Sequence, residues 1–251
     1  MTNFIKKKNI MTQKDIEFWE KYYLDQIEFM LLKDKNKMIN ALNSKDEIKD
    51  DWIKVYQKKV SDIDRGAERI YFWLLNQLGF PNSTPVGSDL LYETSNIFIH
   101  IDVKTSSYYT NSKGKITINS GDFKGLVSIG KNQTSYHYTD EKGITHEANL
   151  PPIYKTKNKL CLTYIIHLIY DKEKDGNLKI LALLLIAIPN GKLHSIYKDK
   201  ICGGSKNKCE AFRYRYKENP YFQLLKDKPY RLKVLYLEKN IMIKDITDFK
   251  L

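Results

Sequence analysis

The stretch VGSDLLYETSNIFIHIDVKTS, residues 86–106, contains two aspartates and a lysine in the pattern that decides the predicted fold. Side chains of an extended strand alternate between its two faces. The strand therefore has two rows of side chains, which are Ile97, Ile99, Ile101 and Val103 on one face and Phe98, His100, Asp102 and Lys104 on the other. The pattern predicts a strand that buries its apolar row and presents an acid and a base together.

The residues before this strand predict a hairpin that adds a second acid. Residues 93–96, Glu-Thr-Ser-Asn, have the composition of a turn, so the preceding segment can fold back and bring Asp89 towards Asp102. Two neighbouring carboxylates repel each other unless a cation lies between them, and their oxygens suit a hard divalent cation such as Mg²⁺. Such an ion activates water and stabilises charge on a phosphate, while Lys104 positions or polarises the nucleophile. The pattern therefore predicts metal-assisted phosphodiester hydrolysis. An ordinary strand that carries Asp and Lys on its solvent face is the alternative.

The composition indicates a basic globular protein. The chain has 251 residues with 42% hydrophobic content, enough for one large domain or for a core with helical additions. Its 42 Lys and Arg against 30 Asp and Glu give a net charge of +12. This charge favours association with a polyanion, and nucleic acid is the leading partner. A lysine-rich surface that reflects genomic composition is the alternative.

Other protein classes lack their expected signatures. Cys161, Cys202 and Cys209 have no paired C-x-x-C spacing, so we expect neither a disulfide framework nor a zinc site. No apolar run reaches the ~20 residues of a membrane-spanning helix, and the lysines near the N-terminus precede no apolar signal segment. Walker and H-E-x-x-H motifs do not occur. We expect a cytoplasmic protein with no membrane partner and no nucleotide cofactor.

Apolar residues at spacings of three and four predict helices over about 13–32, 46–60 and 62–78. The first two are expected to support the core or a dimer contact. Glu68 lies at the edge of the apolar stripe of the third helix, where it could add a metal or water contact. The alternative is an exposed glutamate that pairs with Arg65 or Arg69.

Strands are predicted over about 115–119, 160–170, 178–189 and 231–238. The segment 178–189 is apolar nearly throughout, as expected of a central strand covered on both faces. His167 and His100 are interpreted as core or edge residues, although His100 shares the face of Asp102 and could contact substrate.

Two later segments offer groups that suit DNA. The polar segment 131–135 contains amides and hydroxyls that can read base edges, and nearby lysines can meet phosphates. Within 213–216, arginines alternate with tyrosines, which places both guanidiniums on one face of a strand. An ordinary surface loop and a charged edge strand are the alternatives. The candidates are Lys124, Lys131, Asn132, Gln133, Thr134, Ser135, Arg213 and Arg215.

The order of these features resembles the PD-(D/E)xK nuclease superfamily and, more narrowly, the type II restriction endonucleases. The resemblance covers residues 62–189 and rests on Asp89 and on the Asp102-Val103-Lys104 motif. It implies an α/β (α+β) fold in which a central mixed β-sheet is flanked by helices. An N-terminal helical region, residues 1–60, would pack on a nuclease core with DNA-contacting loops, residues 61–251.

The resemblance also implies an activity and its residues. Asp89 matches the first acid, Asp102 the second and Lys104 the lysine, while Glu68 matches the helix glutamate that some members use. The implied enzyme is a Mg²⁺-dependent endonuclease of a restriction-modification system, a homodimer that cuts double-stranded DNA at a specific sequence. A junction-resolving or repair nuclease and a non-catalytic DNA-binding module are the alternatives.

One position departs from the family pattern. Ser88 stands where the family name has proline, which leaves Glu93 as a competing acidic ligand. Asp89 is preferred because Gly87-Ser88 directly before it allows backbone and substrate to approach closely.

Overall fold

The computed structural model describes residues 11–33, 35–43, 89–110, 116–120, 123–124, 126–139, 142–172, 178–198, 202–204, 211–215 and 228–242. The predicted helices over 46–60 and 62–78, Glu68, and the expected boundary between residues 60 and 61 lie outside these ranges. Among the described residues, no helix is both long enough and apolar enough to cross a membrane.

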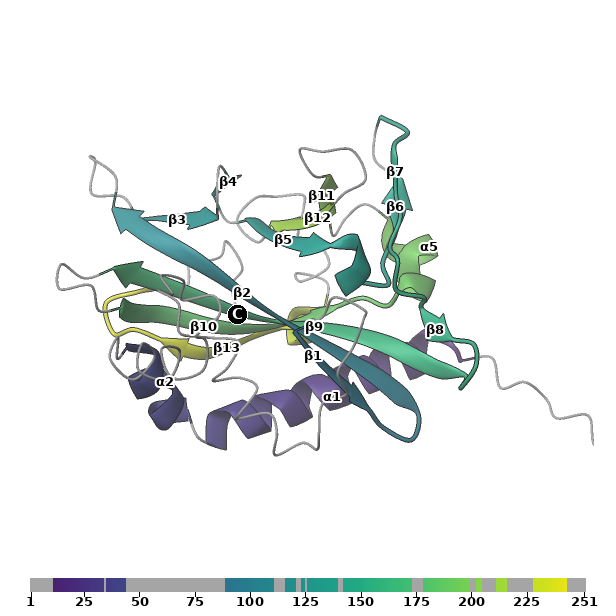
Figure 1. Cartoon of the computed structure of the whole chain (residues 1–251), viewed down its shortest axis with the longest axis horizontal. Helices are drawn as coiled ribbons and strands as arrows, with labels where there is room; N and C mark the ends of the chain where they lie inside the picture. The colour runs from purple at the N-terminus through teal and green to yellow at the C-terminus, as the bar shows by residue number, and fades with distance from the viewer. Residues whose placement is uncertain are drawn as a thin grey trace, which may run out of the picture.

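A mixed sheet of eight strands forms the centre of the described fold (Figure 1). Its strand order is β13-β10-β9-β2-β3-β4, with β1 paired to β2 and β8 paired to β9. Strands β2 and β9 are parallel, and the other pairs are antiparallel. The strands are β1 (Leu90–Glu93), β2 (Ile97–Thr110), β3 (Ile116–Ser120), β4 (Phe123–Lys124), β8 (Ile153–Tyr154), β9 (Lys159–Lys172), β10 (Leu178–Ile188) and β13 (Leu232–Leu237). The predicted mixed sheet is confirmed.

Strand β2 pairs with β9 along one edge and with β1 and β3 along the other, and its residues 97–103 are buried on both faces. The apolar row is buried as predicted, with Ile97 and Ile101 both 0% exposed. The other row is also buried as far as Asp102, which the alternating pattern did not predict: His100 is 0% exposed and Asp102 is 1% exposed. Strand β10 is buried from residue 180 to residue 188, in agreement with its nearly continuous apolar sequence.

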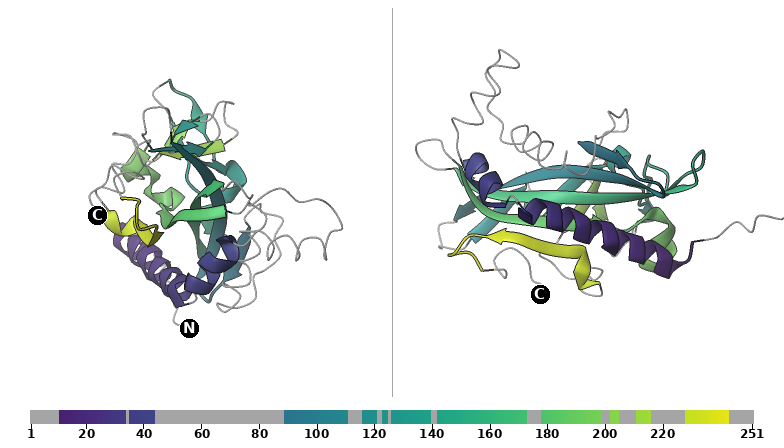
Figure 2. Two further views of the ribbon diagram at one scale, coloured as in Figure 1. Left: turned by 90° about the vertical axis from the view of Figure 1, so that its left-hand side faces the viewer. Right: turned by 90° about the horizontal axis from the view of Figure 1, so that it is seen from below.

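One face of the sheet is covered by helix α1 (Gln13–Lys33), which runs along β9, β10 and β13 (Figure 2). Its buried apolar residues Ile16, Leu24, Ile27 and Leu31 recur at helical spacing, so the helix predicted over 13–32 is confirmed. The short helix α2 (Lys35–Asn43) follows and contacts β10.

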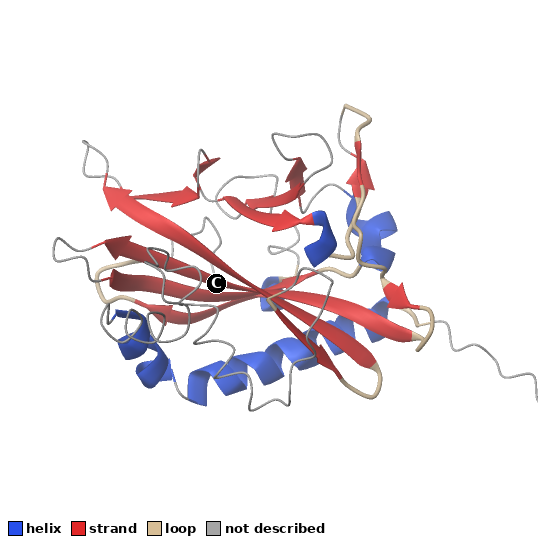
Figure 3. Ribbon diagram, viewed as in Figure 1, coloured by secondary structure: helices blue, strands red, loops and turns tan. Residues whose placement is uncertain are grey.

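A second, three-stranded sheet lies on the side of the main sheet opposite to α1 (Figures 1 and 3). It has the order β11-β12-β5, from β11 (Cys202–Gly204), β12 (Ala211–Arg215) and β5 (Leu126–Gly130). The short helix η2 (Lys131–Gln133) continues directly from β5. Beyond it lie the hairpin β6 (Tyr138–Thr139) and β7 (Thr145–His146), and the helical turns η3 (Gly191–Leu193) and α5 (His194–Tyr197).

A buried ion pair connects α1 to the C-terminal part of the sheet. Arg231, at the end of η5 (Pro229–Arg231), donates from Nε to Glu20 Oε1 at 2.5 Å, and both side chains are 0% exposed. Burial opposes the charge on the guanidinium, but Glu20 outweighs it, so the pKa of Arg231 is raised. The Tyr230 hydroxyl donates to the same Glu20 oxygen at 2.8 Å.

Replacing Arg231 by Met should destabilise the protein strongly, because the buried Glu20 carboxylate would lose the cation that balances it. The expected loss is about 3–5 kcal/mol of unfolding free energy. The matched control is Lys21→Met, which breaks the Lys21–Asp25 pair on the exposed side of the same helix and should cost about 0.5 kcal/mol. Urea unfolding followed by circular dichroism compares the variants, and equal losses would contradict a special role for the buried pair.

Candidate active site

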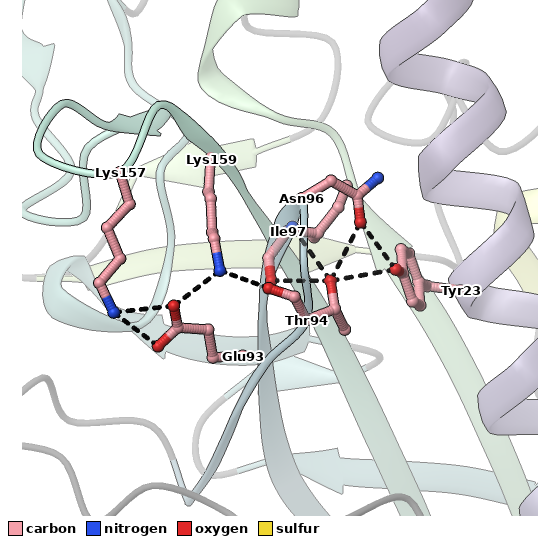
Figure 4. A network of polar contacts seen from close by, with 7 residues as sticks. All are labelled: Tyr23, Glu93, Thr94, Asn96, Ile97, Lys157 and Lys159. Atoms are coloured by element: carbon pink, nitrogen blue, oxygen red, sulfur yellow. Dashed lines mark hydrogen bonds and ion pairs between the residues drawn. The ribbon is translucent and has the colours of Figure 1, made fainter.

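The β1–β2 hairpin forms where the sequence predicts it, and α1 holds its turn. Thr94 N donates to the Ile97 carbonyl at 2.9 Å, which closes the turn. The hydroxyl of Tyr23 on α1 lies 3.1 Å from both Thr94 Oγ1 and Asn96 Oδ1 (Figure 4). The turn is therefore fixed relative to the helix-covered face of the sheet.

Glu93, the competing acid, is engaged at this end of the hairpin. Its carboxylate accepts from Lys157 Nζ at 2.8 Å and from Lys159 Nζ at 2.7 Å (Figure 4). These hydrogen bonds lower the pKa of Glu93. Glu93 pairs with Phe98 in the register, and it lies four residues, or about 13 Å, along the strand from Asp89. The geometry favours Asp89 over Glu93 as the partner of Asp102.

The register of the hairpin brings Asp89 to Asp102. Leu90 pairs with Ile101, so Asp89, one residue before β1, comes opposite Asp102. Asp89 Oδ2 accepts a hydrogen bond from Val103 N at 2.6 Å, which fixes this carboxylate beside the strand. Two acids that are 13 residues apart in the chain therefore share one small volume, as the sequence predicted.

Asp102 is a buried carboxylate with a hydrogen bond to one oxygen and an ion pair to the other. Gln133 Nε2 donates to Oδ1 at 2.6 Å, and the ammonium of Lys104 forms an ion pair with Oδ2. Burial raises the pKa of Asp102 to about 7; Lys104 opposes this rise, and the neighbouring Asp89 carboxylate adds to it. The nearby positive charge of Lys104 therefore does not fully offset the cost of burying the Asp102 carboxylate in its charged form.

Lys104 lies beside a neutral histidine. Its register partner on β9 is His167, which is 0% exposed and whose Nε2 lies 2.8 Å from Ser106 Oγ. Burial, with a smaller effect from Lys104, lowers the pKa of His167 to about 3. An uncharged imidazole leaves the Lys104 ammonium, at 25% exposure, as the positive group on this face of β2.

His100 lies on the same face of β2 as Asp102, two residues earlier in the strand. It is 0% exposed, and burial lowers its pKa to about 4, so the ring is neutral at physiological pH. Neither ring nitrogen has a hydrogen-bond partner among the described residues. The structure places this side chain in the interior, in agreement with its interpretation as a core residue.

The segment that was expected to read bases divides between surface and interior. Asn132 is exposed and Lys131 is partly exposed, both on η2. Thr134 and Ser135 are 0% and 2% exposed, and each bonds within the chain: Thr134 Oγ1 accepts from Tyr136 N, and Ser135 Oγ accepts from Gly191 N. Burial removes both hydroxyls from any surface that a duplex could reach.

The remaining candidates lie on strands of the two sheets. Lys124 is the last residue of β4 in the main sheet. Arg213 and Arg215 lie on β12, which pairs with β5 so that Arg213 is opposite Ser128 and Arg215 opposite Leu126. Strand β12 therefore lies beside β5, the strand that leads directly into η2, although β12 follows η2 in sequence by about 80 residues.

Comparison with protein families identifies the chain. Residues 12–175 match the family model for the N-terminal domain of the type II restriction enzyme MwoI, and residues 180–237 match the model for its central domain. The chain belongs to the MwoI family of type II restriction enzymes. Membership of this family means that the protein is a restriction endonuclease with the PD-(D/E)xK fold. A search of curated protein sequences gives no match.

Two solved restriction endonucleases share the fold of this family member. Tetrameric SfiI bound to cognate DNA aligns with a TM-score of 0.65 and 14% identity over 92% of this chain and 88% of SfiI. BglI bound to its DNA recognition sequence aligns with a TM-score of 0.61 and 15% identity over 87% of this chain and 89% of BglI. At this level of identity the likeness shows the fold, and the predicted restriction-endonuclease-like architecture is confirmed.

Asp102→Asn should stabilise the metal-free protein at high pH. The raised pKa of Asp102 means that the folded state holds its proton more tightly than the unfolded state, so wild-type stability falls as pH rises from about 4 to about 7. The asparagine variant escapes this loss, and its advantage should grow across that window to at most about 4 kcal/mol. Urea unfolding in a chelator at pH 5 and pH 8 measures it; a variant that is less stable than wild type at pH 8 would contradict this account of the site.

Proposed function

We propose that this restriction endonuclease hydrolyses phosphodiester bonds of double-stranded DNA at a specific sequence and depends on Mg²⁺. The observation that carries the proposal is the position of Asp89, which lies opposite Asp102 in the hairpin and accepts a hydrogen bond from Val103 N, while Asp102 forms an ion pair with Lys104. Family membership supports the nuclease activity, and the geometry supplies an acid pair and a lysine that suit it.

The acid pair fits a divalent cation. Asp102 is buried and its pKa is raised to about 7, so its anionic form lacks sufficient positive charge nearby. A hard cation bound by Asp89 and Asp102 would supply that charge. The described residues contain no group of three or more His, Cys, Asp or Glu side chains suited to a metal, so water and phosphate oxygens would complete the coordination.

The protein groups around the pair have separate roles in hydrolysis. Asp89 and Asp102 would hold Mg²⁺, which when bound makes a water molecule more acidic and offsets negative charge on the phosphate. Asp102 orients Lys104 through their ion pair. The Lys104 ammonium would hold the attacking water and stabilise charge that develops on the phosphate oxygens. His167, neutral beside Lys104, adds no competing positive charge.

DNA contact is proposed through basic and polar residues of η2, β4 and β12. The net charge of +12 favours a polyanion, and partly exposed Lys131 and exposed Asn132 project from η2, whose third residue contacts Asp102. Lys124, Arg213 and Arg215 are proposed as further contacts from their strands. We also propose that the protein is a homodimer that cuts both strands. Because SfiI is a tetramer, a tetramer is the second assembly to test.

Asp102→Asn and Lys104→Ala should each reduce DNA cleavage by at least about 100-fold, since the first removes a carboxylate that would hold Mg²⁺ and the second removes the ammonium that would stabilise charge developing on the phosphate. The assay follows conversion of supercoiled plasmid in Mg²⁺ and in a chelator. The matched control is Glu93→Gln, which neutralises an acid on the same hairpin that is bound by two lysines, and it should keep wild-type cleavage within a few-fold. Full Mg²⁺-dependent nicking by Asp102→Asn would contradict the assignment.

Sequence specificity should appear as discrete fragments when a phage genome is digested in Mg²⁺, because one short recognition sequence recurs at fixed places. The same assay separates the alternatives. Preference for a four-way junction or mismatched duplex over linear duplex would indicate a junction-resolving or repair nuclease. Salt-sensitive binding that is unaffected by Mg²⁺, with no cleavage of any DNA, would indicate a non-catalytic binding module.

A further inference from the structure

Gln133 contacts the buried carboxylate from another part of the fold. Its Nε2 donates to Asp102 Oδ1 at 2.6 Å, across 31 residues of sequence. The other end of the same amide, Oε1, accepts from Gly130 N at 2.5 Å. Because a backbone N–H can only donate, the amide oxygen must face Gly130 and the amide nitrogen must face Asp102.

The turn that carries Gln133 is itself held in place. The Lys131 carbonyl accepts from Asn149 N at 2.7 Å, and the buried residues Thr134 and Ser135 follow directly. At Gly130, an added Cβ would lie 2.6 Å from Asn132 Oδ1 and 3.1 Å from Gln133 Oε1, so glycine leaves room for the inward fold of the amide. Gln133 therefore reaches Asp102 from a fixed base at the end of β5.

The chemistry of the contact suits a residue that supports a metal ligand. An ionised carboxylate has about four lone-pair sites, and a single N–H occupies one of them. Gln133 adds no charge, so it orients Asp102 without replacing the positive charge that the acid pair still requires. A lysine or arginine at this position would compete with the cation.

We propose that Gln133 is a positioning residue for the metal site: its amide fixes the orientation of Asp102 and connects that carboxylate to the sheet that contains β5 and β12. The proposal rests on the proposed function, because it takes Asp89 and Asp102 as the ligands of Mg²⁺. Groups that hydrogen-bond a metal ligand typically contribute about 10–100-fold to metal affinity. Gln133 thus serves the catalytic centre from the inside of η2, while Asn132 beside it faces solvent.

Titration of Mg²⁺ into the full chain by calorimetry, without DNA, tests the proposal independently of activity. Gln133→Met keeps the approximate length of the side chain but removes both hydrogen bonds, and it should bind Mg²⁺ about 10–100-fold more weakly than wild type. Gln133→Asn, one methylene group shorter, cannot bridge Gly130 and Asp102 and should behave similarly. The matched control is Gln13→Met, which breaks an exposed amide–carboxylate hydrogen bond to Glu17 and should leave Mg²⁺ binding unchanged.

Cleavage kinetics supply a second readout that a purely structural role would not give. The Mg²⁺ concentration for half-maximal cleavage should rise about 10–100-fold in Gln133→Met, while the rate at saturating Mg²⁺ stays within a few-fold of wild type. Wild-type Mg²⁺ affinity in both Gln133 variants would overturn the proposal, and so would loss of folding in both. If wild type and Asp102→Asn do not differ in Mg²⁺ binding, the metal site of the proposed function fails instead.

Discussion

A carboxylate that is 1% exposed is the constraint on which the rest of the site depends. Burying Asp102 is unfavourable unless its charge is balanced, and burial raises the pKa of this carboxyl to about 7 although Lys104 opposes the rise. Asp89 adds to the rise rather than opposing it. The site therefore holds two acids close together, Asp102 buried and Asp89 exposed, and a bound cation would convert their unfavourable proximity into a favourable interaction.

Several parts of the fold hold this unfavourable arrangement together. The register of β1 on β2 sets Asp89 against Asp102, and the Tyr23 contacts hold the hairpin turn against α1. Helix α1 is in turn joined through Glu20 to Arg231, the last residue of η5, directly before β13. On the other side of the sheet, Gln133 reaches Asp102 from the strand system that includes β12. Elements from the beginning, middle and end of the chain thus fix one pair of acids.

Local pattern was sufficient to predict the elements and the acid pair. Alternation identified β2, turn composition placed Asp89 next to Asp102, and the apolar run identified β10 as a central strand. Long-range packing was not predictable. Nothing in the polar segment 131–135 distinguishes Gln133, which contacts Asp102, from Thr134 and Ser135, which are buried. The contact of Gln133 depends on a strand about 30 residues earlier, and Ser135 bonds to Gly191, about 55 residues later. The burial of Asp102 itself likewise follows from what covers β2 rather than from its alternation.

A direct measurement would locate the cation. Crystals of the protein with duplex DNA and Mn²⁺ in place of Mg²⁺ allow the ion to be placed by its anomalous scattering. The account predicts an anomalous peak coordinated by carboxylate oxygens of both Asp89 and Asp102, within about 2.0–2.3 Å of each. An ion bound elsewhere, with these two carboxylates left without a cation in the DNA complex, would contradict it.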